Sequence, residues 1–116
     1  MKKILIIDDE SEYVNDLARG LTMLGYEPFK AEDGEGGLAA IGKEKPDIAL
    51  CDYILPDIDG DIVLKRAKDS HPDVKFVMVT AYYDEKVKER LKRLGADEVI
   101  YKPLDLKALD ELLKDL

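Results

Sequence analysis

The 116-residue chain has few of the residues that mark several common classes of protein. It has one cysteine, Cys51, which cannot form an internal disulfide and lies in an apolar run typical of a buried strand. Its one histidine, His71, lies in a polar turn, and we expect an exposed loop residue without a catalytic or metal-binding role. No run of 18 apolar residues and no secretory apolar region is found, so we expect a cytoplasmic protein without a membrane span.

Basic residues are in the minority. The 18 lysines and arginines are outnumbered by 26 aspartates and glutamates, giving a formal net charge of -8. Neutralising phosphates requires a basic surface, so this balance argues against direct binding of nucleic acid. It is compatible with binding of cations or basic surfaces, although solubility alone also explains it.

Short apolar runs alternate five times with helical patterns. The predicted strands are residues 3–7, 27–31, 48–51, 74–79 and 98–101. The first helix is predicted to begin at an N-cap, Ser11, and to end at Gly25. The others are predicted at about residues 34–43, from Gly60 to the turn at 71–72, at about 84–94, and from Leu106 onward. The second, rich in glycine, should be the least stable.

Alternating strands and helices predict an α/β fold with a parallel sheet and helices on both faces. We expect a doubly wound sheet of strand order 2-1-3-4-5, because Pro28 cannot complete a ladder and belongs at a sheet edge. In such a sheet, ligands bind at the carboxyl ends of the strands, where the strand order reverses. The first and third strands end there in Asp8, Asp9 and Asp52.

Three neighbouring carboxylates repel one another, so at least one would have a raised pKa without a compensating charge. A hard divalent cation, Mg²⁺ or Mn²⁺, would provide that charge. Thr80 and Lys102 end the fourth and fifth strands and add a hydroxyl and an ammonium. Together these groups predict a receptor for a phosphoryl group, with Asp52 as the nucleophile.

These residues resemble the receiver domain of two-component response regulators. The resemblance rests on the acidic pair at 8–9, on Asp52 with its loop DYILPDIDG, on Thr80-Ala81 and on Lys102-Pro103, and it covers the whole chain. It implies a (βα)5 flavodoxin-like fold, like that of chemotaxis regulators. It also implies a single receiver domain over residues 1–116, with no output domain in this chain.

The resemblance assigns roles to individual residues. Asp52 accepts a phosphoryl group from a sensor histidine kinase or a histidine phosphotransfer protein. Asp9, Asp52 and the Ile54 carbonyl bind Mg²⁺, assisted by Asp8. Thr80 and Lys102 hold phosphate oxygens, and the Lys102-Pro103 bond is cis in the family, which would direct Lys102 into the site. Pro56 and Gly60 shape the loop.

Two departures from the family pattern affect switching. The position that often carries a mobile aromatic residue is Val99, and Tyr101 lies two residues later on the same predicted face. Ile54 and Tyr82 occupy the two positions that flank the phosphoryl group in the family. We expect them to restrict water and to lengthen the lifetime of the phosphorylated form.

The predicted fourth helix is basic in an otherwise acidic chain. Its lysines and arginines could simply pair with Glu85 and Glu89. Alternatively, movement of Thr80 would pull residues 81–84 and displace this helix. The surface of the fourth helix, fifth strand and last helix would then be an output face, and the hypothesis is that phosphorylation promotes a homodimer through it.

Two other classes of protein are alternatives to this interpretation. One is a receiver-like binding module that accepts no phosphate. The other is a haloacid-dehalogenase-like phosphatase, whose nucleophile would follow the first strand in an Asp-x-Asp pattern, whereas this chain has Asp8-Asp9-Glu10 and no cap domain. We expect a signalling domain rather than an enzyme, one that catalyses only its own phosphorylation and dephosphorylation.

Overall fold

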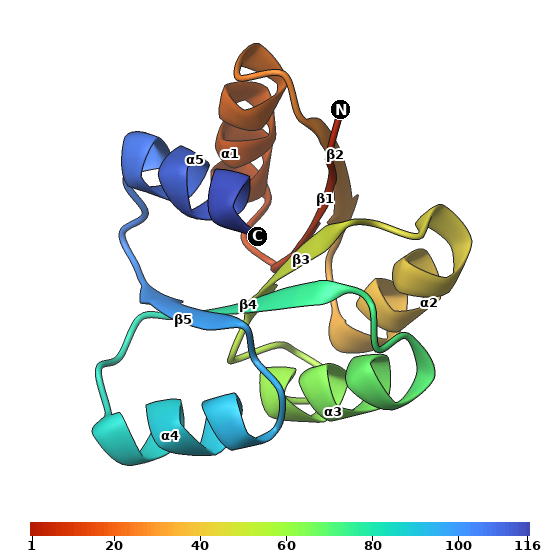
Figure 1. Cartoon of the computed structure of the whole chain (residues 1–116), viewed down its shortest axis with the longest axis vertical. Helices are drawn as coiled ribbons and strands as arrows, with labels where there is room; N and C mark the ends of the chain where they lie inside the picture. Colours follow the sequence, from red (N-terminus) through yellow and green to blue (C-terminus); the bar gives the residue numbers. More distant parts are fainter.

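A parallel sheet of five strands forms the middle of the molecule (Figure 1). The computed structural model describes residues 1–116. The strands are β1 (Lys3–Ile7), β2 (Glu27–Ala31), β3 (Ile48–Asp52), β4 (Lys75–Thr80) and β5 (Glu98–Tyr101). Their order is β2-β1-β3-β4-β5, so the predicted fold class is confirmed, and Pro28 lies on an edge strand as predicted.

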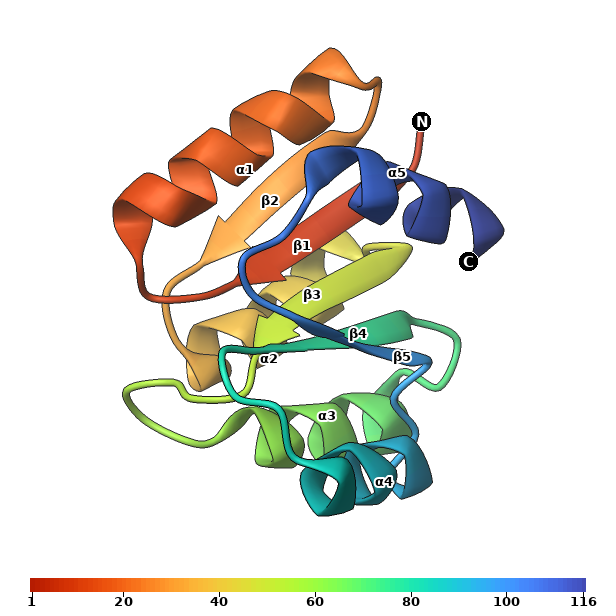
Figure 2. The same ribbon diagram turned by 90° about the vertical axis from the view of Figure 1, so that its left-hand side faces the viewer.

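Five helices cover the two faces of the sheet. They are α1 (Ser11–Met23), α2 (Gly34–Glu44), α3 (Gly60–Ser70), α4 (Glu85–Arg93) and α5 (Leu106–Asp115). Figures 1 and 2 show α1 and α5 on one face and α2, α3 and α4 on the other. None of the five combines the length and the apolar character that crossing a bilayer requires.

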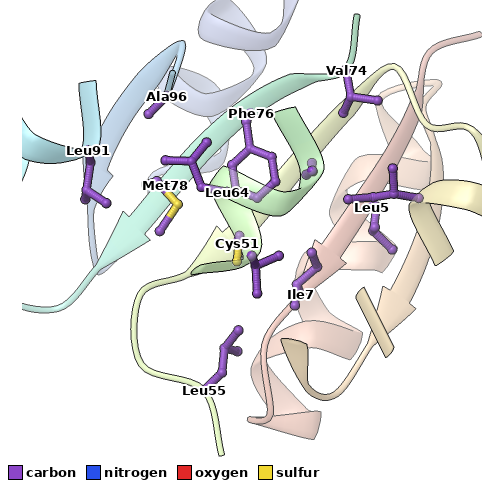
Figure 3. Close-up of a cluster of buried hydrophobic side chains, with 14 of the residues drawn as sticks. Leu5, Ile7, Cys51, Leu55, Leu64, Val74, Phe76, Met78, Leu91 and Ala96 are labelled. Atoms are coloured by element: carbon purple, nitrogen blue, oxygen red, sulfur yellow. The ribbon is translucent and has the colours of Figure 1, made fainter. Parts of the chain in front are cut away.

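Alternate side chains of each strand enter separate cores on the two faces. On one face Ile4, Ile6 and Val77 pack against α1 and α5. On the other, Leu5, Ile7, Met78 and their neighbours pack against α2, α3 and α4 (Figure 3). Cys51 is fully buried in this second core, as predicted. Both faces of the central strands are therefore apolar, and only the strand ends are free for polar side chains.

Several local predictions need correction. Glu10, not Ser11, is the N-cap of α1, and its side chain makes no capping hydrogen bond. His71 is half-buried at the C-cap of α3 rather than exposed, because its ring lies beside Gly42 of α2. In α4 only Leu91 is fully buried, while Val87 and Leu94 are half-buried at the rim of the core.

Candidate functional site at the strand ends

The polar residues predicted from the sequence meet at the carboxyl edge of the sheet. Asp8 and Asp9 follow β1, Asp52 and Thr80 end β3 and β4, and Lys102 follows β5. An open pocket at this edge is lined by ten residues: Asp9, Glu10, Asp52, Ile54, Leu55, Pro56, Thr80, Ala81, Tyr82 and Lys102. The topology therefore brings together side chains that are up to 94 positions apart in the sequence.

The ammonium of Lys102 is the centre of the polar contacts. Its Nζ lies 2.9 Å from Asp8 Oδ2, 3.2 Å from Asp52 Oδ2 and 3.3 Å from Glu10 Oε1. Burial alone would lower the pKa of Lys102, but the hydrogen bond with Asp8 and the charges of Asp52 and Asp8 outweigh burial and raise it. The ring of Tyr13 lies against the same ammonium, 4.6 Å from Nζ to the ring centroid. Lys102 is thus a fixed cation among carboxylates.

Asp52 has the character expected of the reactive carboxylate. Its side chain is largely buried, and burial raises its pKa above the ordinary value, against the opposing charge of Lys102 and with a further upward contribution from Asp8. The expectation that one carboxylate of the group has a raised pKa is therefore met at Asp52. Asp8 is buried, and its Oδ1 accepts a hydrogen bond from Glu10 N at 2.9 Å.

The acidic cluster in the structure includes Glu10, which the sequence analysis did not predict. Oxygens of Asp8, Glu10 and Asp52 lie within 4.8 Å of one another, a set that could hold a metal ion. All are carboxylate oxygens, the ligands that Mg²⁺ and Mn²⁺ prefer. Asp9 lines the same pocket but lies outside this set. Glu10 was missed as a site residue, although it directly follows the acidic pair.

Thr80 and its neighbours form the opposite wall of the pocket. The Thr80 hydroxyl is buried and engaged with its own loop: it accepts from Tyr82 N at 3.2 Å and lies 3.4 Å from Tyr82 O. Ala81 is exposed, as are Ile54 and Tyr82, with 56% and 70% of their surfaces accessible. The Lys102-Pro103 peptide bond is cis, as the resemblance implied.

The loop between β3 and α3 is attached at three points. Tyr53 N donates to Val79 O at 2.9 Å, and Gly60 N donates to Tyr53 O at 2.7 Å. Between these points, the Asp57 carboxylate accepts from Gly34 N at 2.8 Å and Glu35 N at 2.9 Å, and so caps α2. These hydrogen bonds lower the pKa of Asp57 to about 2. Sequence reasoning missed this role, because the two partners are over twenty residues away.

Val99 and Tyr101 share one face of β5, as predicted from strand alternation. Val99 is buried in the core below α4, and Tyr101 packs at its edge beside Thr80, its partner in the β4–β5 register. The Tyr101 ring lies 5.1 Å from that of Tyr83, centroid to centroid, and its buried hydroxyl has no hydrogen-bond partner. An aromatic residue is therefore present beside the site, nearer to it than Val99.

The basic residues of α4 do not pair with Glu85 and Glu89. Arg90 contacts Asp61 of α3 and the Tyr53 hydroxyl, and Lys92 contacts Glu98 of β5. The alternative of pairing within the helix is thus wrong for Arg90 and Lys92. Acceptors on neighbouring elements are nearer to their long side chains.

An acidic cluster, a buried hydroxyl and an ammonium at the ends of a 2-1-3-4-5 sheet define the class of receiver domains. The sequence model of the family described as "Response regulator receiver domain" matches residues 4–114. The chain belongs to the response regulator receiver domain family.

Individual relatives are, by their names, a phosphotransferase and a transcriptional regulatory protein. The chain is 33% identical to sporulation initiation phosphotransferase F of Bacillus subtilis, over 97% of this chain and 91% of that protein. It is 35% identical to the alkaline phosphatase synthesis transcriptional regulatory protein PhoP of the same species, over 97% of this chain but 47% of that protein. The chain thus spans about half the length of the curated transcriptional regulators it matches.

Solved structures confirm the fold. A CheY-like response regulator receiver domain protein from Methanospirillum hungatei superimposes with a TM-score of 0.94 at 35% identity, covering 99% of this chain and 92% of that one. A two-component response regulator from Clostridium difficile gives 0.94 at 26% identity, covering 99% and 94%.

Proposed function

We propose that Asp52 is the phosphoacceptor of a phosphorelay signalling domain. The observation that carries the proposal is the contact of Asp52 with Lys102 beside an oxygen cluster that could hold a cation. In the proposed step an Asp52 oxygen forms a bond to phosphorus, and the bond from phosphorus to the donor nitrogen breaks. The donor is a phosphohistidine of a sensor histidine kinase or a phosphotransfer protein, and its imidazole retains the electron pair and is protonated.

The cluster fits a divalent cation, since its ligands are all oxygens. Asp9, Asp52 and the Ile54 carbonyl are the proposed ligands of Mg²⁺ or Mn²⁺, with Asp8 and Glu10 beside them. Bound there, the cation would neutralise charge on the phosphoryl oxygens. Lys102 is placed to bind one phosphoryl oxygen, which requires its ammonium to turn from Asp8 toward the new group. Thr80 would exchange its contacts with Tyr82 for another oxygen.

The movement of Thr80 is the proposed origin of the output signal. It draws in residues 81–84, which lead directly into α4. Within the α4-β5-α5 output face, β5 and α5 form an open apolar pocket whose lining includes Ile100, Leu104 and Leu112. The basic α4 of one copy could meet the acidic α5 of another, so we propose a phosphorylation-dependent homodimer. Sedimentation that remains monomeric with saturating beryllofluoride would contradict the dimer alone.

A direct labelling experiment tests the central proposal. The chain is incubated with Mg²⁺ and acetyl phosphate, and the phosphorylated species is measured by intact mass, with Asp52→Asn as control. We expect one phosphoryl group in the wild type and none in Asp52→Asn or in the presence of EDTA. Continuous release of phosphate from unrelated monoesters would support a phosphatase, and absence of labelling would support a binding module.

A further inference from the structure

The helix α4 is held to the rest of the domain by little apolar surface. Leu91 is its only fully buried residue, and Val87 and Leu94 are half-buried. Helical stability in proteins derives mostly from packing of the apolar face. Polar contacts with neighbouring elements therefore help to fix the position of α4.

The strongest of these contacts are made by Arg90. Its Nη1 donates to Asp61 Oδ2 at 2.6 Å, and its Nη2 donates to the Tyr53 hydroxyl at 2.6 Å. The guanidinium also lies 6.0 Å from the centroid of the Tyr53 ring. The side chains of Arg90 and Asp61 are 39% and 20% exposed, so solvent screens this pair less than a surface ion pair. We call Arg90, Asp61 and Tyr53 the Arg90 cluster.

Both partners of Arg90 belong to the part of the chain that directly follows Asp52. Tyr53 is the next residue, and its backbone is hydrogen-bonded to β4 and to the first residue of α3. Asp61 lies in the first turn of α3, where a negative charge is favourable. The Arg90 cluster therefore ties α4 to the fixed frame around the phosphoacceptor, whereas Lys92 ties it to the edge strand β5.

We propose that Arg90 is a positioning residue: the Arg90 cluster holds α4 in the position seen in the structure, and phosphorylation of Asp52 weakens that hold. The statement about phosphorylation rests on the proposed function. In the structure the Thr80 hydroxyl contacts Tyr82 and not Asp52, and the Arg90 cluster fixes α4 in this arrangement. If Thr80 moves toward Asp52, residues 81–84 shift the beginning of α4, while the partners of Arg90 stay with α3. The two Arg90 hydrogen bonds must then lengthen or break.

Thermodynamic linkage predicts whether removal of the Arg90 cluster strengthens or weakens binding of a phosphoryl mimic. An interaction made only in one arrangement lowers the affinity for any ligand that favours the other. Removing the Arg90 cluster should therefore loosen α4 and at the same time strengthen binding of a phosphoryl mimic. A residue with a merely structural role would lower stability without improving binding.

Hydrogen exchange of the α4 amides tests the holding role without any phosphoryl group. The variants are Arg90→Met, which keeps an unbranched side chain, and Tyr53→Phe, which removes only the hydroxyl. Arg93→Met is the matched control, because Arg93 is an exposed arginine of the same helix whose side chain makes no hydrogen bond or ion pair. We expect exchange of the α4 amides about tenfold faster in the first two than in the control. Equal rates in all three would overturn the proposal.

Beryllofluoride binding in Mg²⁺ tests the linkage. We expect Arg90→Met to bind about three- to tenfold more tightly than the wild type, and the double variant with Tyr53→Phe to gain less than the sum of the two. Unchanged or weaker binding in Arg90→Met would overturn the regulatory half. A wild-type chain that binds no beryllofluoride would instead refute the proposed function, and hydrogen exchange would then decide the positioning role alone.

Discussion

The ammonium of Lys102 lies 3.2 Å from the carboxylate of Asp52, and 2.9 Å from that of Asp8. Lys102 thereby already neutralises part of the charge that a divalent cation would neutralise. The raised pKa of Lys102 keeps this ammonium protonated throughout the neutral range. A divalent cation bound there would therefore compete with the Lys102 ammonium for one set of oxygens.

Lys102→Met should tighten Mg²⁺ binding while weakening retention of the phosphoryl group. Removing the competing ammonium leaves carboxylates that gain more from a metal, and we expect a several-fold lower dissociation constant, about 1 kcal/mol. Calorimetric titration with MgCl₂ measures it. Lys107→Met, at an exposed lysine of α5, is the control, and weaker Mg²⁺ binding by Lys102→Met would contradict the competition.

Tyr82→Ala should shorten the lifetime of the phosphorylated protein. Tyr82 lines the same pocket as Asp52, so its ring can hinder an incoming water. Loss of the phosphoryl group after removal of the donor is followed by intact mass. Tyr83→Ala is a matched control, because Tyr83 is similarly exposed (67% against 70%) but does not line the pocket. An unchanged rate in Tyr82→Ala would count against shielding.

Gly60→Ala should destabilise the domain and disturb Asp52. A Cβ at residue 60 would overlap the Asp52 carbonyl oxygen and lie 2.8 Å from Met78 Cε and 2.9 Å from Tyr53 Cα. We expect a loss of about 1–3 kcal/mol in the free energy of unfolding, measured by urea denaturation, together with reduced labelling.

The helical Gly42 offers the opposite case in the same assay. A Cβ there would approach nothing closer than 3.9 Å, to His71 Nε2. Gly42→Ala should therefore stabilise the domain by about 0.5–1 kcal/mol. A Gly60→Ala variant as stable as Gly42→Ala would show that the loop can move away from α3.

Asp57→Asn should flatten the dependence of stability on pH in acid. The folded-state pKa of Asp57 is about 2, below the ordinary 3.8, so the ionised carboxylate adds stability above about pH 4 that is lost as the pH falls toward 2. The variant lacks this contribution at every pH. Urea midpoints from pH 6 to pH 2.5 measure the difference, with Asp73→Asn, which caps no helix, as control. Parallel profiles of Asp57→Asn and wild type would refute the capping role.

The parts of this structure that sequence patterns could predict are those fixed by periodicity. Alternation in β1 assigns Ile4 and Leu5 to opposite cores, and Pro28 identifies an edge strand. The strand ends then place Asp8, Asp52, Thr80 and Lys102 at one edge of the sheet without knowledge of a single contact. Strand order and the candidate site could both be predicted in this way.

Contacts between side chains of different elements could not be predicted. Arg90 has glutamates in its own helix, yet it contacts Asp61 and Tyr53, because the fold brings these two acceptors within reach of its guanidinium. From the sequence alone, the side chain of Asp57 could equally well face solvent or cap α2. Ser11 has a side chain that is preferred at N-caps, but the helix already begins at Ser11, so Glu10, with an extended backbone, is the N-cap.

The three attachments of the β3–α3 loop have a consequence for recognition. With Tyr53, Asp57 and Gly60 fixed, only residues 54–56 and 58–59 lie between anchors, and Leu55 among them is itself buried in the core. Most of the conformational entropy of the β3–α3 loop is therefore lost when the domain folds, and little remains to be lost when a phosphodonor binds. Under the proposed function, a donor histidine would therefore meet a loop that is already ordered, and the encounter would resemble the docking of two preformed surfaces more than the closing of a lid.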